Sequence, residues 1–170
     1  MFTAPARDAI AHAQDEARDL GHQTVQIEHL LLGLFSDHDG IASGVLADFG
    51  LTAAPVRRLV RERLGGGSGS LAGGKVPFSP EAKDALRSAN MIGMGEPGTE
   101  HMLIVLVRRG EGGACDILRA LGVDPHQVRF ETKKRVWPSS FSQPGTRTRG
   151  EVRLVRSVPA ESIRELDFEE

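Results

Sequence analysis

The sequence predicts an all-α fold of two tandem four-helix repeats arranged as a pseudo-twofold bundle. One stretch, IEHLLLGL at 27–34, returns 72 residues later as TEHMLIVL at 99–106. The match continues downstream without a gap, and its pairs include Gly40 with Gly112 and Gly50 with Gly122. Apolar residues in both halves recur at three- and four-residue steps, which indicates amphipathic helices. An internal duplication of this kind predicts one helical unit used twice.

The first repeat is expected to span residues 2–64. Thr3 is placed to cap a first helix that carries an alanine-rich buried stripe and ends at Gly21. Two further helices are predicted at about 27–35 and 41–49. A fourth begins at Thr52 and ends at Gly65, with four arginines opposite its apolar side. Those arginines are interpreted as a solvated charged face.

A Gly/Ser-rich linker is predicted at 65–76, ahead of a second repeat at 77–136. The linker contains GSLAGGK, which matches the first seven positions of a P-loop. Val76 stands where the magnesium-binding hydroxyl would be, and Pro77 follows instead of a helix, so nucleotide binding is not expected. In the second repeat Ser79 takes the capping position of Thr3, and helices are predicted at about 100–109, 113–121 and 125–136. The stretch ahead of Glu100 is four residues shorter than its counterpart.

Residues 137–170 are predicted to form a C-terminal extension outside both repeats. The pattern at 151–158, EVRLVRSV, alternates polar with apolar residues as a short strand would. The acidic ending, ESIRELDFEE, is either a docking peptide or a solvated tail.

Composition narrows the class of protein. A net charge of −2 argues against a general nucleic-acid binder, and no apolar run reaches the roughly 18 residues of a membrane span. A cytoplasmic location is therefore expected. Cys115 is the only cysteine and lies among apolar residues, which favours a buried, unreactive thiol. The motif EHLLLGL is not HExxH, and no nucleophile is paired with a base, so no catalytic residue, metal or cofactor is predicted.

Longer motifs resemble the double Clp repeat, the N-terminal domain of the ClpA and ClpC class of AAA+ unfoldases, over about residues 2–136. They are FTxxARDAIxxAxxEARDLGH from Phe2, EHLLLGL from Glu28, PFSPEAK from Pro77, TEHMLIVL from Thr99 and EGGACDILRALGVD from Glu111. The chain contains no usable Walker A motif. We therefore expect a stand-alone Clp-repeat protein without the ATPase modules.

The resemblance implies a non-enzymatic module that captures substrates or docks on adaptors and Clp components of the ClpC or ClpP type. Its implied ligands include phosphoarginine-marked segments, held by Glu28 and Glu100 together with the hydroxyls of Thr3 and Ser79. It also implies an apolar surface near Phe2 and Phe78 that takes cyclic peptides.

Simpler roles exist for each of these residues. A carboxylate in the first turn of a helix is favourable by roughly 0.3–1 kcal/mol without any ligand. Capping explains Thr3 and Ser79, and hydrophobic-staple packing explains Phe2 and Phe78. Two other functions stay open: an ATPase or hydrolase, and a structural accessory subunit of a Clp protease assembly without a ligand pocket.

Overall fold

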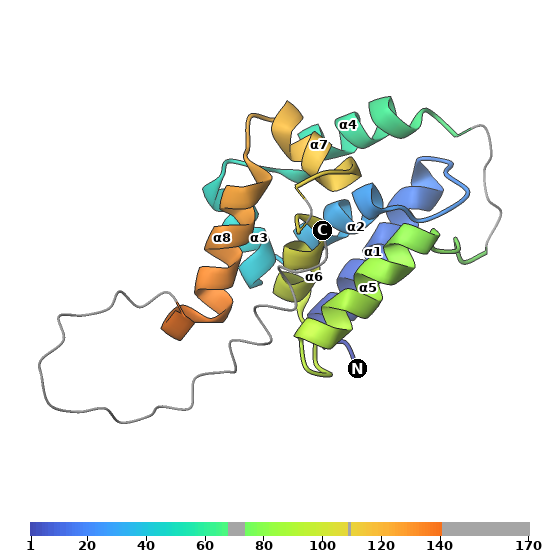
Figure 1. Cartoon of the computed structure of the whole chain (residues 1–170). Coiled ribbons are helices and arrows are strands. Elements are labelled where there is room, and N and C mark those ends of the chain that lie inside the picture. The colour runs from blue at the N-terminus through green and yellow to red at the C-terminus, as the bar shows by residue number, and fades with distance from the viewer. Residues whose placement is uncertain (68–73, 109, 141–170) are drawn as a thin grey trace, which may run out of the picture. The chain divides into compact units, whose positions relative to one another are not determined.

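The computed structural model describes residues 1–67, 74–108 and 110–140, which include eight α-helices (Figure 1). Four belong to the first repeat: α1 (Ala4–Asp19), α2 (Ile27–Gly33), α3 (Ile41–Asp48) and α4 (Ala53–Leu64). Four belong to the second: α5 (Pro80–Ile92), α6 (Thr99–Leu106), α7 (Gly113–Ala120) and α8 (Pro125–Val136). Short 3-10 turns follow α2 at Leu34–Ser36 and α8 at Pro138–Ser140. The all-α prediction is confirmed.

Side-chain caps fix the starts of three helices. The Thr3 hydroxyl accepts the amide of Ala6 at 3.4 Å, and the Ser79 hydroxyl accepts that of Ala82 at 3.2 Å. The Asp124 carboxylate accepts the amide of His126 at 2.9 Å and begins α8. Each cap satisfies one of the amides that a helix start leaves without an intrahelical partner. Thr52 begins α4 without such a side-chain bond.

The ends of the two central helices differ from the sequence prediction. The predicted second helix is divided, because α2 ends at Gly33 and a 3-10 turn carries the chain on to Ser36. The predicted 100–109 helix is shorter than expected, since α6 ends at Leu106 and a turn follows. Periodicity alone does not fix such ends, because a terminal turn keeps the same buried face.

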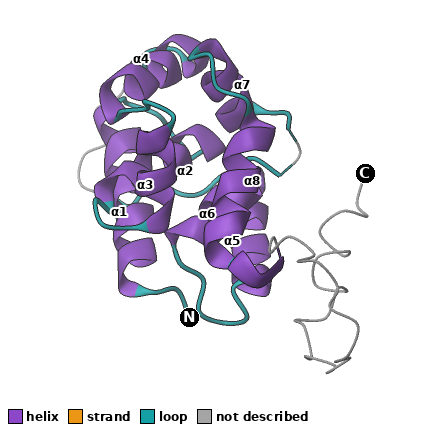
Figure 2. Cartoon of the chain, turned by 90° about the vertical axis from the view of Figure 1, so that its left-hand side faces the viewer, coloured by secondary structure: helices purple, strands orange, loops and turns teal. Residues whose placement is uncertain are grey.

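The packing of the helices obeys a pseudo-twofold relation. α1 packs on α2 as α5 packs on α6, and α2 packs on α4 as α6 packs on α8. Helices also cross between the repeats, since α2 contacts α7 as α6 contacts α3, and α3 contacts α8 as α7 contacts α4. Figure 2 shows α4 and α7 together at one end of the bundle. Each repeat therefore completes the core of the other.

Short backbone segments are exchanged in the same way. The amide of Thr3 donates to the carbonyl of Pro97 at 3.1 Å, and the amide of Ser79 donates to that of Val25 at 2.9 Å. Val25 and Phe78 form an isolated parallel bridge. The start of α1 is thus held beside the segment that enters α6, and the start of α5 beside the segment that enters α2.

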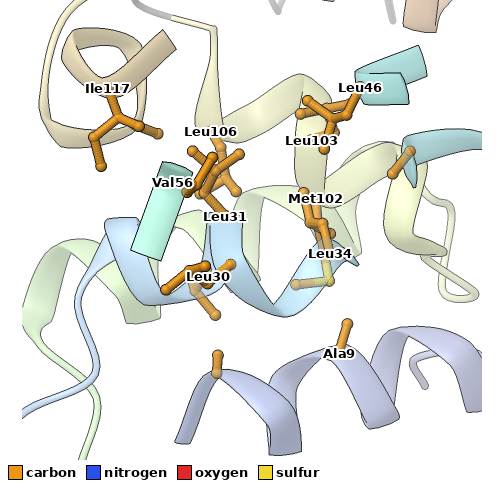
Figure 3. Packing of buried hydrophobic residues seen from close by; sticks show 14 of the residues in the cluster. Ala9, Leu30, Leu31, Leu34, Leu46, Val56, Met102, Leu103, Leu106 and Ile117 are labelled. Atoms are coloured by element: carbon orange, nitrogen blue, oxygen red, sulfur yellow. The ribbon is translucent and has the colours of Figure 1, made fainter. Parts of the chain in front are cut away.

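The core is continuous across the two repeats. Figure 3 shows Leu30, Leu31 and Leu34 of the first repeat among Met102, Leu103 and Leu106 of the second. All six are at least nine-tenths buried. Gly33 permits the close approach of α2 to α1, because a Cβ at this position would overlap the carbonyl oxygen of Ala9.

The described ends of the glycine-rich segment lie along α1. The amide of Gly67 donates to the carbonyl of Leu20 at 3.2 Å, and the Gln14 side chain donates to the carbonyl of Val76 at 3.2 Å. Helix α5 begins at Pro80, so no helix starts at Lys75 as a P-loop requires. The predicted strand at 151–158 lies outside the described residues. Within those residues, no helix is long and apolar enough to cross a membrane.

Candidate functional site

Glu28 is a buried carboxylate in the first turn of α2. The residue is 5% exposed, and its Oε1 accepts a hydrogen bond from Nε of Arg63 on α4 at 3.1 Å. Arg63 also places Nη2 2.8 Å from Oδ2 of Asp116 on α7. The guanidinium therefore bridges carboxylates from two other helices, and charge-assisted hydrogen bonds of this type are among the strongest in proteins.

Gly113 lets the Glu28 carboxylate reach the beginning of α7. A Cβ at residue 113 would overlap Oε1 and Cδ of Glu28, so a larger residue would displace the side chain. The start of a helix carries partial positive charge, which favours a carboxylate placed there. Glu28 is thus stabilised by the α7 terminus and by Arg63 together.

Glu100 occupies the equivalent position in α6 but has a different environment. Its side chain is 20% exposed and folds back over Gly98, where an added Cβ would overlap the carboxylate. Among the described residues no arginine or lysine forms an ion pair with it, while Nδ1 of His101 lies 3.1 Å from Oε1. When Nδ1 of His101 carries a proton, its hydrogen bond is the main cause that lowers the pKa of Glu100, and burial opposes it. Glu100 is therefore a partly accessible carboxylate without a lysine or arginine partner among the described residues.

The histidine after each glutamate completes a helix start. The amide of Gln26 donates to Nδ1 of His29 at 2.9 Å, and the amide of Gly98 donates to Nδ1 of His101 at 3.1 Å. Nδ1 of His101 accepts this bond while it is unprotonated and donates to Glu100 only when it carries a proton. The two contacts therefore belong to different protonation states, and we adopt the capping state because His29 repeats it.

The structure does not join the predicted hydroxyls directly to the predicted carboxylates. Thr3 and Ser79 act as helix caps, and no hydrogen bond links either hydroxyl to Glu28 or Glu100 in the described part of the chain. The exchanged backbone bonds nevertheless place Thr3 beside Pro97, three residues before Glu100. They place Ser79 beside Val25, three residues before Glu28. Each capping residue therefore lies beside the segment that leads to the glutamate of the other repeat.

Phe2 and Phe78 hold equivalent positions ahead of the two caps. Both are partly buried and pack against the core, and Phe78 takes part in the bridge to Val25. Their packing accounts for a staple-like role. Among the described residues, the most exposed large hydrophobic side chains lie elsewhere: Met1 at 85%, Met91 at 76%, Met94 at 90% and Phe130 at 51%.

The arginines of α4 correct one interpretation of the sequence. Arg57 donates to the Glu16 carboxylate, with Nε 2.8 Å from Oε2, and Glu16 is only 3% exposed. Arg63 binds Glu28, so two of these arginines are partners of buried acids and do not form a purely solvated face. The position of Glu16 on the alanine stripe of α1 was the available signal, because a carboxylate on a buried face requires a partner.

A surface hollow that the sequence did not indicate lies between α3 and α8. Its volume is about 580 Å³, and its lining includes Phe49, His126 and Phe130. None of the six predicted ligand residues lines it. No group of three or more metal-ligating side chains is present among the described residues.

Comparisons with known proteins agree with the two-repeat architecture of the chain. The model of the Clp repeat (R) N-terminal domain matches residues 1–93 and 83–148. The chain is 40% identical over 143 residues to the chloroplastic chaperone protein ClpC1 of Oryza sativa, which covers 82% of this chain and 16% of that relative. It is also 40% identical over 143 residues to the chloroplastic ClpA homolog CD4B of Solanum lycopersicum, an ATP-binding subunit of the ATP-dependent Clp protease. That match covers 82% of this chain and 15% of the relative, so the chain spans about a sixth of the length of these proteins.

Solved structures share the fold. The N-terminal domain of the chaperone ClpD from Arabidopsis thaliana superposes with a TM-score of 0.66 at 24% identity, covering 79% of this chain and 94% of that chain. The Hsp104 N-terminal domain from Candida albicans gives a TM-score of 0.64 at 18% identity, covering 79% of this chain and 91% of that chain. These similarities extend over most of the described residues.

Proposed function

Because the chain belongs to the Clp repeat N-terminal domain family, we propose that it is a docking module that captures peptide or protein ligands for a Clp protease system. The ligand class that the site favours is a phosphoarginine-marked segment. Relatives of this chain are named as chaperones and as ATP-binding subunits of the Clp protease, which supports the assignment. The proposal assigns binding to this chain and no chemical step.

The observation that carries the proposal is the guanidinium held by Glu28. Nε of Arg63 donates a hydrogen bond to the Glu28 carboxylate, so the space beside this carboxylate accommodates a guanidinium group. Glu100 presents the repeat-related carboxylate, which is more accessible and has no arginine partner among the described residues. A carboxylate of this kind is the group expected to bind the guanidinium end of phosphoarginine.

The phosphoryl end requires donors and a positive potential. Thr3 and Ser79 begin α1 and α5, which are long enough for their N-terminal ends to favour an anion. The exchanged backbone bonds support a pocket made of Glu100 with Thr3 and a second made of Glu28 with Ser79. Each proposed pocket therefore takes its carboxylate from one repeat and its hydroxyl from the other.

Isothermal titration calorimetry with free phosphoarginine tests the proposal. Glu100→Gln removes the charge with little change in shape, and we expect the affinity of the Glu100 pocket to fall at least about tenfold, because hydrogen bonds to charged groups contribute about 1.5–3 kcal/mol. Glu62→Gln is the matched control, since Glu62 is an exposed acid of α4 that contributes to neither proposed pocket. Equal affinities for the two variants, or no binding by the unaltered chain, would refute the proposal.

We further propose that the rings of Phe2 and Phe78 form an apolar surface beside the two pockets. Each partly buried ring immediately precedes a capping hydroxyl, so an apolar ligand and a phosphorylated one would share the same helix starts. A cyclic peptide is the probe. Phe78→Ala is expected to weaken its binding, whereas Phe130→Ala, at an exposed ring of the hollow between α3 and α8, leaves the affinity unchanged. Equal effects of the two substitutions would exclude this surface.

The proposed partners are ClpC-type or ClpP-type rings in the cytoplasm. Size-exclusion chromatography with purified rings tests this association. Association with a ring without binding of phosphoarginine or of a cyclic peptide would favour the alternative, a structural accessory subunit.

A further inference from the structure

The two glutamate sites are related by the repeat but differ in the residues around them. In the 72-residue register Arg63 corresponds to Arg135, Asp116 to Gly44 and Gly113 to Ile41. Both arginines lie near the ends of equivalent helices, α4 and α8. Two of these three pairs differ in residue type, and the arginine is present at both sites.

At the first site the surrounding residues direct an arginine of this chain onto the glutamate. Asp116 holds Nη2 of Arg63 at 2.8 Å, while Nε of the same guanidinium contacts Glu28 at 3.1 Å. Gly113 leaves the space in which the Glu28 carboxylate lies. The side chain of Glu28 is only 7% exposed to solvent, and Arg63 is in direct contact with its carboxylate.

At the second site the equivalent arginine is directed elsewhere. Arg135 pairs with Asp48 on α3, and Gly44 provides no carboxylate where the first site has Asp116. Ile41 carries a Cβ at the position where Gly113 leaves space, so the beginning of α3 differs from that of α7. Glu100 accordingly turns back over Gly98.

We propose that Arg63 is a built-in competitor that occupies the Glu28 site, so that an arginine-marked ligand binds at Glu100 first and at Glu28 only after Arg63 is displaced. This inference rests on the proposed function, because it concerns the order in which the two proposed pockets fill. Arg63 is 41% exposed and belongs to the last turn of α4, where its side chain has solvent into which to move. The apparent affinity of the Glu28 site is reduced by the fraction of molecules in which Arg63 has left it.

Phosphoarginine titrations of the full chain test the order of filling. In a Glu100→Gln background only the Glu28 site is left, and adding Arg63→Ala is expected to raise its affinity about tenfold, which corresponds to displacement of Arg63 in about a tenth of molecules. Arg61→Ala is the control, because Arg61 is exposed on the same helix. Asp116→Asn, which removes the second acid that holds Arg63, is expected to give a smaller gain. It serves as the test variant if Arg63→Ala does not fold.

The outcomes separate this inference from the proposed function. Measurable binding at Glu100 with no gain from Arg63→Ala or Asp116→Asn would overturn the inference and leave the proposed function standing. Absence of phosphoarginine binding to every variant would refute the proposed function. Occupation of the Glu28 site is then decided by an NMR titration with methylguanidinium. Saturable chemical-shift changes near Glu28 in Arg63→Ala that are absent in Arg61→Ala would support the proposal that Arg63 occupies the Glu28 site. Equal chemical-shift changes in the two variants would overturn the proposal.

Discussion

Acid is expected to destabilise this protein through His29. The His29 ring is fully buried, and its pKa is lowered from 6.5 to about 4, first by burial and then by repulsion from His22. The hydrogen bonds explain why the ring resists a second proton. Nδ1 of His29 accepts the Gln26 amide, and Nε2 lies 2.7 Å from Nδ1 of His22. Nε2 of His22 lies 2.7 Å from the carbonyl of Gly65, which only accepts, so in the neutral pair each ring carries its proton on Nε2.

The size and sign of the effect follow from linkage. Between pH 6.5 and about pH 4 the unfolded chain binds a proton at His29 that the folded chain does not, so the free energy of unfolding falls as the pH falls through this window. Each pKa unit corresponds to 1.36 kcal/mol, which gives about 3 kcal/mol for the whole shift and about 2 kcal/mol between pH 7.5 and pH 5. Above pH 7 the contribution is constant.

Urea unfolding at pH 7.5 and pH 5 measures this difference, with His29→Gln as the variant that cannot titrate. The unaltered chain should lose about 2 kcal/mol more than His29→Gln over this interval. His126→Gln, at an exposed histidine, should behave like the unaltered chain. If the unaltered chain and His29→Gln lose the same free energy, the reasoning about the buried pair is wrong.

Three further predictions concern packing, charge and thiol chemistry. Gly33→Ala should lower the free energy of unfolding by about 1–3 kcal/mol in urea titrations, because the added methyl overlaps the Ala9 carbonyl between α1 and α2. Arg57→Ala should cost about 1–3 kcal/mol in the same assay, because it removes the guanidinium that donates to the buried Glu16 carboxylate. Cys115 should resist an aromatic disulfide reagent at neutral pH until the chain unfolds, since the thiol is buried and burial raises its pKa.

A control variant or control condition tests each of these three predictions. Gly66→Ala, where an added Cβ meets nothing within 4 Å, should be nearly neutral, and a cost equal to that of Gly33→Ala would disprove the steric argument. Arg58→Ala breaks a pair with the exposed Glu62 and should cost less than about 0.5 kcal/mol, so parity with Arg57→Ala would contradict the role of burial. Reaction of Cys115 in the folded chain at the rate of the urea-unfolded chain would show that the thiol is accessible.

Local signals in the sequence were sufficient for most of the fold. Thr3 and Ser79 were placed correctly as caps because a hydroxyl followed by proline within two residues is a strong helix-start signal. The 72-residue register predicted which helices are equivalent. It did not predict that the start of α1 pairs with Pro97, because that bond joins residues far apart in the chain and depends on how the repeats cross.

The environment of the candidate site was harder to predict for a related reason. The polar side of α4 is solvated in a single helix, and only the neighbouring α2 and α7 turn Arg63 into a partner of Glu28 and Asp116. The difference between the sites depends on single residues such as Gly113, which the repeat pattern pairs with Ile41 without revealing the effect. The charged partners of the two glutamates are therefore set by tertiary contacts, which the repeat pattern in the sequence does not reveal.

A crystal structure of the chain bound to phosphoarginine tests the central claim most directly. We predict a guanidinium within hydrogen-bonding distance of the Glu100 carboxylate, its phosphoryl group near the start of α1, and Arg63 still paired with Glu28 at sub-saturating ligand. A ligand bound in the hollow between α3 and α8, or at Glu28 with the Glu100 site empty, would contradict the account.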